Sequence, residues 1–375
     1  MCGFSFTVFL SVFQLLPTAP FHIIDLGGTA FTAGLFLALL TYASSLSAPL
    51  TGALADRIGK RRMLVVGSIA SAVFSLVCGL APTYPLLLAV VAVYGVFWSG
   101  LLSSSAAYMT DIIPPHRRAE GIGYWGVSTV AAIAIAPTIG LWIYHRGWLW
   151  VCLTTMVLNV MMGAIAWRLP ETRIAADGPA APRGPILEWR LFAVALTLFL
   201  YSFGYGGITS FVALYATANH VTPVGIYFTV FSVVTVLTRP FSGPLADRRG
   251  HRRVLVPCLA LVVLGYTLLA VSGTRPWLVA SAIVFGVGFG SAYPIFVAHV
   301  MRHVDDRRRG AAFGSIIAAF DVGIGTGSMT LGWLVQNYGF SRAYAVAALL
   351  ATLSIPYFLI VERRLLTAHA ASSRQ

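Results

Sequence analysis

Charged residues are scarce in this chain, and that scarcity excludes most classes of soluble protein. Only 10% of the 375 residues are Asp, Glu, Lys or Arg, whereas 58% are hydrophobic, and the mean hydropathy is +0.83. A soluble domain carries about 25% charged residues, so this chain could not cover its surface with polar groups. We therefore expect a lipid bilayer around most of it.

Motifs for metals, cofactors and catalysis are also lacking. The four cysteines lie in or beside apolar runs without CxxC spacing, which is typical of small core residues. There is no Walker lysine, no zinc-ligand spacing and no nucleophile triad. The glycine-rich stretches GVGFG (286–290) and GIGTG (323–327) lie inside apolar runs and predict helix packing. We expect no cofactor, no metal and no ATP hydrolysis in this chain.

Twelve apolar runs are each long enough to cross a bilayer as a helix, since one crossing takes about 20 residues. A tilted barrel strand needs only about 10 residues, so the length of these runs favours helices over strands. The predicted spans lie at 3–24, 30–51, 63–81, 86–109, 121–143, 147–168, 189–214, 223–244, 254–273, 277–300, 311–335 and 341–361. The predicted fold class is an all-α integral membrane protein.

The basic residues predict the orientation in the membrane. With both termini in the cytoplasm, 22 of the 25 Lys and Arg residues fall on the cytoplasmic side, and only Arg146, Arg275 and Arg342 fall outside. Positive residues are retained on the cytoplasmic side. The net charge of +13 therefore indicates topology and no nucleic-acid partner, and we expect a multi-pass protein of the bacterial inner membrane.

One charged segment occurs twice in the chain. GALADRIGKRR occupies 52–62 and GPLADRRGHRR occupies 243–253, so a shift of 191 residues superposes them. The same shift superposes a second loop, placing Arg117, Arg118 and Gly123 on Arg308, Arg309 and Gly314. Because one offset fits two separate loops and each half holds an even number of helices, the halves are predicted to be parallel repeats of six helices.

A stretch rich in proline, glycine and charge separates the two repeats. ETRIAADGPAAPRGPILEW lacks apolar periodicity and is typical of a linker. We therefore expect a six-helix bundle over 1–168, a cytoplasmic linker over 169–188, a second bundle over 189–362 and a cytoplasmic tail over 363–375.

Twelve helices, a central linker and the duplicated motif G-x-L-A-D-R-x-G-[KH]-R-R resemble the major facilitator superfamily over essentially the whole chain. Within that superfamily, the chain is most similar to bacterial sugar-efflux and multidrug-like permeases. The resemblance implies alternating access, in which two halves rock around a site near the membrane midplane. We expect a monomeric secondary transporter of a small-molecule substrate, not an enzyme, with export driven by protons.

The resemblance also implies that each motif copy forms a gate on the cytoplasmic face. The residues implied are Gly52, Asp56, Arg57, Gly59, Gly243, Asp247, Arg248 and Gly250. Glycine permits a close, sharply turned backbone, and Asp56 could cap a helix or pair with an arginine. In the family this aspartate acts against helix 11, where Arg307, Arg308 and Arg309 are available. For the basic residues, a purely topological role stays open.

Asp321 is the clearest charge inside a predicted span. It lies about nine residues, or about 14 Å, into the run 311–335. A charge in lipid costs roughly 2.5–3.5 kcal/mol on insertion scales, so we expect a role in binding protons or a cationic substrate. A hydrogen bond to a neighbouring Ser or Thr is the alternative. The equivalent first-half residue is Val130, so duplication does not account for the charge.

Four further polar residues are candidates for the substrate or proton site, namely Arg239, His22, Gln14 and Asn159. Arg239 could gate the path, bind an anion or extend to the cytoplasmic border. Single polar residues in helix bundles usually make packing hydrogen bonds, which is the competing interpretation for the other three.

Two other functions stay open. A symporter that imports a sugar or small organic acid is favoured by Arg239 and by the segment AIAIAPTIG (132–140), which keeps only Pro137 and Gly140 of the superfamily's antiporter signature. Those two matches still favour export modestly. A lipid-modifying membrane enzyme would need convergent catalytic side chains near the headgroups, and the sequence holds only scattered ones.

The predicted topology can be checked by labelling single cysteines in a cysteine-free background. We expect Arg62→Cys and Arg253→Cys to react with an impermeant maleimide only after the cells are opened, because both positions belong to the positive face. Arg146→Cys should react in intact cells. Labelling of positions 62 and 253 from opposite faces would refute the parallel repeat.

Overall fold

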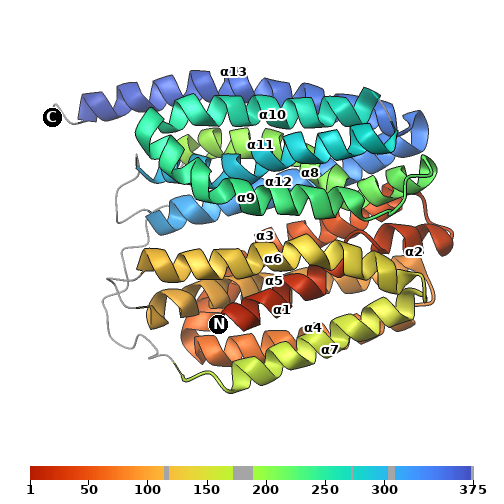
Figure 1. Ribbon diagram of the computed structural model, residues 1–375. Helices are drawn as coiled ribbons and strands as arrows, with labels where there is room; N and C mark the ends of the chain where they lie inside the picture. Colours follow the sequence, from red (N-terminus) through yellow and green to blue (C-terminus); the bar gives the residue numbers. More distant parts are fainter. Residues whose placement is uncertain (114–117, 172–188, 272, 303–308, 373–375) are drawn as a thin grey trace.

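The computed structural model describes residues 1–113, 118–171, 189–271, 273–302 and 309–372, and over these ranges it is helical throughout (Figure 1). The helices are α1 (Cys2–Leu15), α2 (Ala19–Asp25), α3 (Ala30–Ile58), α4 (Lys60–Leu80), α5 (Tyr84–Ile112), α6 (Arg118–Tyr144), α7 (Trp148–Trp167), α8 (Trp189–Ala218), α9 (Ile226–Arg249), α10 (His251–Val271), α11 (Arg275–Met301), α12 (Arg309–Tyr338) and α13 (Phe340–Ser372).

Twelve spans in the described part of the chain are long and apolar enough to cross a membrane. Helices α1 and α2 together form the first span, Cys2–Asp25, with a short turn between them at Pro17, since proline supplies no backbone donor. The prediction of twelve transmembrane helices is confirmed. Helix α13 continues to Ser372, beyond the expected end at 361.

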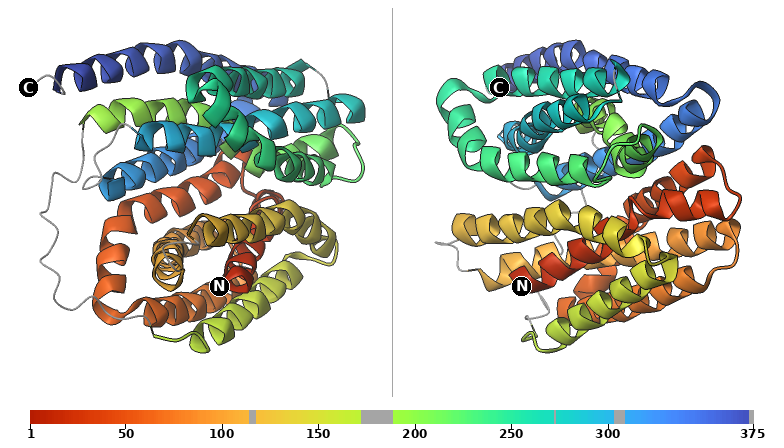
Figure 2. Two further views of the ribbon diagram at one scale, coloured as in Figure 1. Left: turned by 60° about the vertical axis from the view of Figure 1, so that its left-hand side comes forward. Right: turned by 45° about the vertical axis from the view of Figure 1, so that its right-hand side comes forward.

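The helices form two bundles, α1–α7 and α8–α13, which lie one above the other in both views of Figure 2. Each bundle has its own core of buried side chains. Phe4, Leu64 and Leu87 are fully buried in the first core, and Tyr266 and Phe285 are fully buried in the second. The expected linker lies between the bundles in sequence, and its residues 172–188 are outside the described ranges.

The duplicated charged segment consists of helix ends and not, as expected, of a loop. Helix α3 ends at Ile58 and α4 begins at Lys60, so Gly59 alone connects them, with φ +97°. Gly250 connects α9 to α10 in the same way, with φ +91°. Only glycine adopts such a backbone without strain, so a single residue reverses the chain. The charged side chains are therefore held on helices.

The two bundles contact each other through equivalent helix pairs, α3 with α12 and α6 with α9. A Cβ on Gly34 of α3 would lie 3.1 Å from Cα of Met329 and would overlap the Ser328 carbonyl. A Cβ on Gly225, just before α9, would lie 3.3 Å from Cα of Thr138 on α6. The shift of 191 residues relates Gly34 to Gly225 and Thr138 to Met329. The repeat therefore extends to the contacts between the halves.

The one-residue turns can be tested by adding a methyl group. We expect Gly59→Ala and Gly250→Ala to destabilise the folded protein by roughly 1–3 kcal/mol, because alanine is strained at those φ values. Gly52→Ala is the matched control, since its Cβ would meet no atom within 4 Å and alanine favours a helix by up to about 1 kcal/mol. The measurement is the unfolding midpoint in detergent, and equal midpoints for the Gly59 and Gly52 variants would contradict the argument.

Candidate transport site and gates

The face of α3 that packs on α12 is covered at one end and exposed at the other. Gly34 and Ala38 contact α12, and Asp56 lies 18 residues after Ala38, five full helical turns later on the same face. Asp56 is exposed, as are Pro49 and Ala53 on the same side of the helix. The α12 helix therefore no longer covers α3 near Ile58.

Helix α9 repeats this pattern against α6. The hydroxyls of Thr229 and Thr138 form a hydrogen bond of 2.8 Å, and Asp247 lies 18 residues after Thr229, again five turns along one face. On the same side of the helix, Pro240, Pro244 and Asp247 are exposed. We call the end of the bundle that carries Gly59 and Gly250 the motif face; six spans separate these two glycines, so they lie on the same side. The two halves are in contact away from the motif face and part towards it.

The first motif is held by an ion pair that does not involve Asp56. Lys60 at the start of α4 pairs with Asp111 at the end of α5, with Nζ and Oδ2 2.5 Å apart. Arg61 donates to the backbone oxygen of Trp167 at 2.6 Å and stacks over its ring. No described side chain forms an ion pair with Asp56. The first aspartate is therefore unpaired within the described part of its own half.

The second motif has the opposite arrangement. Asp247 accepts a hydrogen bond of 3.1 Å from Arg302 at the end of α11, and His251 Nε2 lies 3.7 Å from the same carboxylate oxygen. The shift of 191 residues places Asp111 on Arg302 and Lys60 on His251. The charge is thus reversed at one equivalent position, acidic in the first half and basic in the second. Because of this reversal, Asp247 forms an ion pair within its own half.

The other predicted gate residues make few contacts in this arrangement. Arg57 and Arg248 are exposed, and neither forms an ion pair with a described side chain. A Cβ on Gly52 or Gly243 would meet no atom within 4 Å, so the present packing does not require glycine there. The partners expected for the first aspartate lie outside the described side chains, namely Arg307, Arg308 and Arg309.

Asp321 lies at the point where α3 and α12 part. It shares a face of α12 with Gly325, Ser328 and Gly332, all of which contact α3. The nearest polar contact between the two helices is the 2.7 Å hydrogen bond between the hydroxyls of Tyr42 on α3 and Thr326 on α12. Thr326 lies five residues after Asp321, about 7.5 Å further from the motif face. The side chain is half-buried. Asp321 therefore lies at the inner end of the opening.

Tyr293 is the described aromatic residue that interacts with this carboxylate, and further rings pack around Tyr293. The ring of Phe320 lies 4.9 Å from the ring of Tyr293 on α11 and 6.3 Å from the ring of Tyr201 on α8. Tyr293 interacts electrostatically with Asp321. Among the described residues, none forms a hydrogen bond or ion pair with Asp321, so the expected alternative of a Ser or Thr partner is not what these residues show.

Arg239 lies deeper in its helix than the sequence predicted. The expected span ended at 244, whereas α9 continues to Arg249, which leaves Arg239 about 15 Å from the helix end. Its side chain is exposed and interacts electrostatically with Tyr201, whose hydroxyl donates to the Phe289 carbonyl at 2.7 Å. Tyr201 thus interacts electrostatically with Arg239, and its ring lies near the ring of Phe320, the residue before Asp321.

Gln14 and Asn159 each form a hydrogen bond to another helix inside the first bundle. Gln14 is buried, and its Nε2 donates to Oγ1 of Thr155 on α7 at 2.6 Å. Asn159 is buried on α7, and its Nδ2 donates to Oγ of Ser75 on α4 at 3.0 Å. These bonds join helices of one half, so we leave both residues out of the proposed site.

His22 lies at the far end of the first bundle from the motif face. Its ring stacks on Trp148 with centroids 4.7 Å apart. Asp25, directly after the predicted span 3–24, is the last residue of α2 and accepts a 2.6 Å hydrogen bond from the Tyr144 hydroxyl. The structure does not bring His22 together with Asp321.

Sequence reasoning missed Tyr201, Tyr293 and Phe320. They come from three different helices, and an aromatic residue within an apolar run looks the same whether it faces a core or a site. Only the position of Phe320, directly before Asp321, was a usable signal.

Comparison with known proteins decides the family. The sequence profile of the Major Facilitator Superfamily matches residues 1–222 and again residues 194–375. The chain belongs to the major facilitator superfamily. It is therefore a multi-pass membrane transporter of that type and not an enzyme, as the resemblance predicted.

Individual members show the same relationship. The uncharacterized MFS-type transporter YhhS of Escherichia coli (strain K12) is 25% identical over 363 residues, which cover 94% of this chain and 89% of that protein. A mutant of the nucleoside transporter NupG superposes with a TM-score of 0.79 at 14% identity over 96% of this chain and 98% of its own. A bacterial homolog of the human lysosomal transporter Spinster gives 0.78 at 16% identity over 96% and 95%.

Proposed function

We propose that this transporter exports a small organic solute in exchange for protons, and that Asp321 is the carboxylate on which solute and proton compete. The observation that supports this most directly is the position of Asp321, half-buried and without a hydrogen-bonding partner among the described residues, where the two halves part. Ionisable groups inside a membrane domain mark ion or substrate pathways, since leaving them there for packing alone is costly.

The chemistry around Asp321 supports a solute with an apolar or aromatic part. Tyr293 interacts electrostatically with the carboxylate, and the ring of Phe320 packs against the ring of Tyr293; aromatic rings attract both flat rings and cations. A protonated carboxylate has no charge to attract a cation, so proton binding would favour release of a cationic solute. That competition is the simplest form of exchange.

The described arrangement is an inward-open state in this proposal. The motif face carries most of the basic residues, which supports a cytoplasmic position at the bacterial inner membrane for this face and for both chain termini. A similar solved structure, the bacterial homolog of Spinster, has an inward-facing and occupied conformation. The opposite state would require the motif ends of α3 and α12, and those of α9 and α6, to meet. The absence of side chains at Gly52 on α3 and Gly243 on α9 would then permit close approach.

Asp56 is the gate residue in this scheme, and Asp247 supports its own half. Asp56 lies on the α3 face that would meet α12 and has no described ion-pair partner to give up. Asp247 already pairs with Arg302. For Asp247 to bind the opposite half instead, this ion pair would first have to break. Arg57 and Arg248, both exposed, would act as cytoplasmic anchors.

Import is the second candidate, favoured by Arg239. An exposed arginine on α9, near Tyr201, could bind the carboxylate of a small organic acid or hydrogen-bond a sugar. The antiporter signature gives export little support, because a Cβ at Gly140 would overlap the Gln14 backbone, so packing explains that glycine. Accumulation in right-side-out vesicles, rather than in everted ones, would establish import.

We expect Asp321→Asn to abolish proton-driven flux. A growth screen of an overexpressing strain against toxic organic cations, anions and nucleosides first identifies a transported compound. In everted vesicles, Asp321→Asn should then lose at least about tenfold of the gradient-driven accumulation, equivalent to about 1.4 kcal/mol of binding, while Asp321→Glu retains part of it. Asp25→Asn, at the far end of the bundle, is the control. Full coupled flux in Asp321→Asn would remove the carboxylate from the mechanism.

Neutralising the two motif aspartates should have unequal effects. We expect Asp56→Asn to insert normally and to reduce flux by about tenfold or more, with a smaller loss in Asp247→Asn because Asp247 is held within one half. Asp111→Arg reproduces the charge found at Arg302, and we expect it to capture Asp56 and slow transport. The readout is flux per correctly inserted molecule, and normal flux in Asp56→Asn would rule out the gate.

A further inference from the structure

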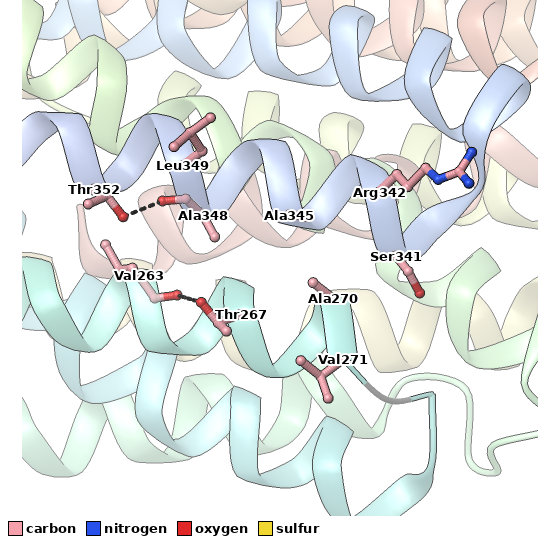
Figure 3. Close-up of a pocket in the computed structure, with 10 residues that line it drawn as sticks. All are labelled: Val263, Thr267, Ala270, Val271, Ser341, Arg342, Ala345, Ala348, Leu349 and Thr352. Atoms are coloured by element: carbon pink, nitrogen blue, oxygen red, sulfur yellow. Dashed lines mark hydrogen bonds between the residues drawn. The ribbon is translucent and has the colours of Figure 1, made fainter.

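A lateral groove lies between α10 and α13 in the second bundle, away from the contact between the halves (Figure 3). Its volume is about 580 Å³. The α10 wall comprises Val263, Thr267, Ala270 and Val271, and the α13 wall comprises Ser341, Arg342, Ala345, Ala348, Leu349 and Thr352. Val271 (73%) and Leu349 (62%) are among the most exposed apolar side chains. The groove therefore opens sideways, towards lipid.

The groove has the length of one membrane leaflet. From Ser341 to Thr352 the α13 wall rises by about 16 Å, at about 1.5 Å per residue. The hydrocarbon core of a bilayer is about 30 Å thick, so the groove covers about half of it. Ser341 and Arg342 lie at the same end as Ala270 and Val271 (Figure 3). That end is opposite to the motif face, since α10 begins and α13 ends at the motif face.

The walls offer almost nothing to a polar ligand. Thr267 donates its hydroxyl to the Val263 carbonyl at 2.9 Å, and Thr352 donates to the Ala348 carbonyl at 2.8 Å. Both hydroxyls are therefore engaged within their own helices. The other wall residues along the length of the groove are Val, Ala and Leu. An unbranched hydrocarbon chain is the ligand that such a surface fits, because it needs no hydrogen bond.

Charge is confined to one end of the groove. Arg342 is the only charged residue in its lining, and it forms no ion pair with a described residue. It is also one of the few basic residues that fall away from the motif face. The Arg342 and Ser341 side chains point in different directions (Figure 3), so the guanidinium, whose fork of donors matches two phosphate oxygens, is the polar contact that this end offers. The charge therefore lies where a lipid headgroup would be.

We propose that this groove is a binding site for one glycerophospholipid of the leaflet opposite the motif face. One acyl chain lies along α10 and α13, and the phosphate pairs with Arg342. The site is separate from Asp321, and the proposal does not depend on the direction of transport or on its coupling ion.

The test counts phospholipids retained by the full-length protein, purified from mixed phosphatidylglycerol and phosphatidylethanolamine vesicles, by native mass spectrometry. Ala345 is exposed, so Ala345→Phe fills the groove without entering the core; Ala260→Phe, at an exposed alanine of α10 outside the groove, is the matched control. We expect the control to retain one phospholipid more than Ala345→Phe at equal activation. Equal lipid counts in these two variants would overturn the proposal.

The charge is tested separately, with Arg342→Gln against Arg275→Gln. Arg275 is the exposed arginine at the start of α11, on the same side of the membrane but outside the groove lining. We expect Arg342→Gln to bind the retained lipid about tenfold more weakly and Arg275→Gln to match the wild type. If Ala345→Phe does not fold, this pair decides, and equal retention in both arginine variants counts against the site.

Discussion

The close contact of α3 with α12 is the constraint on which the rest of the structure depends. Gly34 and Gly332 bring backbone against backbone, and Ser328 donates to the Gly34 carbonyl at 3.0 Å. Between apolar helices in lipid there is little hydrophobic force, so small residues and such hydrogen bonds supply the attraction. Because these contacts occupy one end of the two helices, they hold the halves together there and leave the motif face able to open.

The two halves share a scaffold but not a charge pattern. Equivalent glycines, Gly59 and Gly250, make the same one-residue turn, and equivalent helix pairs join the halves. One charge is reversed between the halves, because the first half has Asp111 where the second has Arg302. As a result Asp247 forms an ion pair within its own half and Asp56, among the described residues, does not. The two halves thus carry two similar motifs, and a single position distinguishes them electrostatically. This asymmetry leaves the Asp56 carboxylate without an ion pair in the described part of its own half, whereas the Asp247 carboxylate is paired with Arg302.

The surroundings of the candidate site depend on the same contact between α3 and α12. Asp321 lies one turn beyond the last close contact between α3 and α12, so any rocking about that contact changes what surrounds the carboxylate. The rings of Phe320 and Tyr293 remain beside it because they belong to the same half. The lateral groove beside Arg342 is far from this opening in the fold, on helices that pack within the second bundle.

The sequence by itself determined the twelve spans, the repeat and the presence of a costly carboxylate at position 321, because hydropathy and helical spacing are local properties of the chain. The tertiary structure decided how each helix is rotated and therefore which polar groups meet. Gln14 and Asn159 form hydrogen bonds to other helices of the first bundle, and Tyr201 and Tyr293 lie near the candidate site. These contacts join residues far apart in sequence, and an apolar run carries no local signal of which neighbour each face will meet.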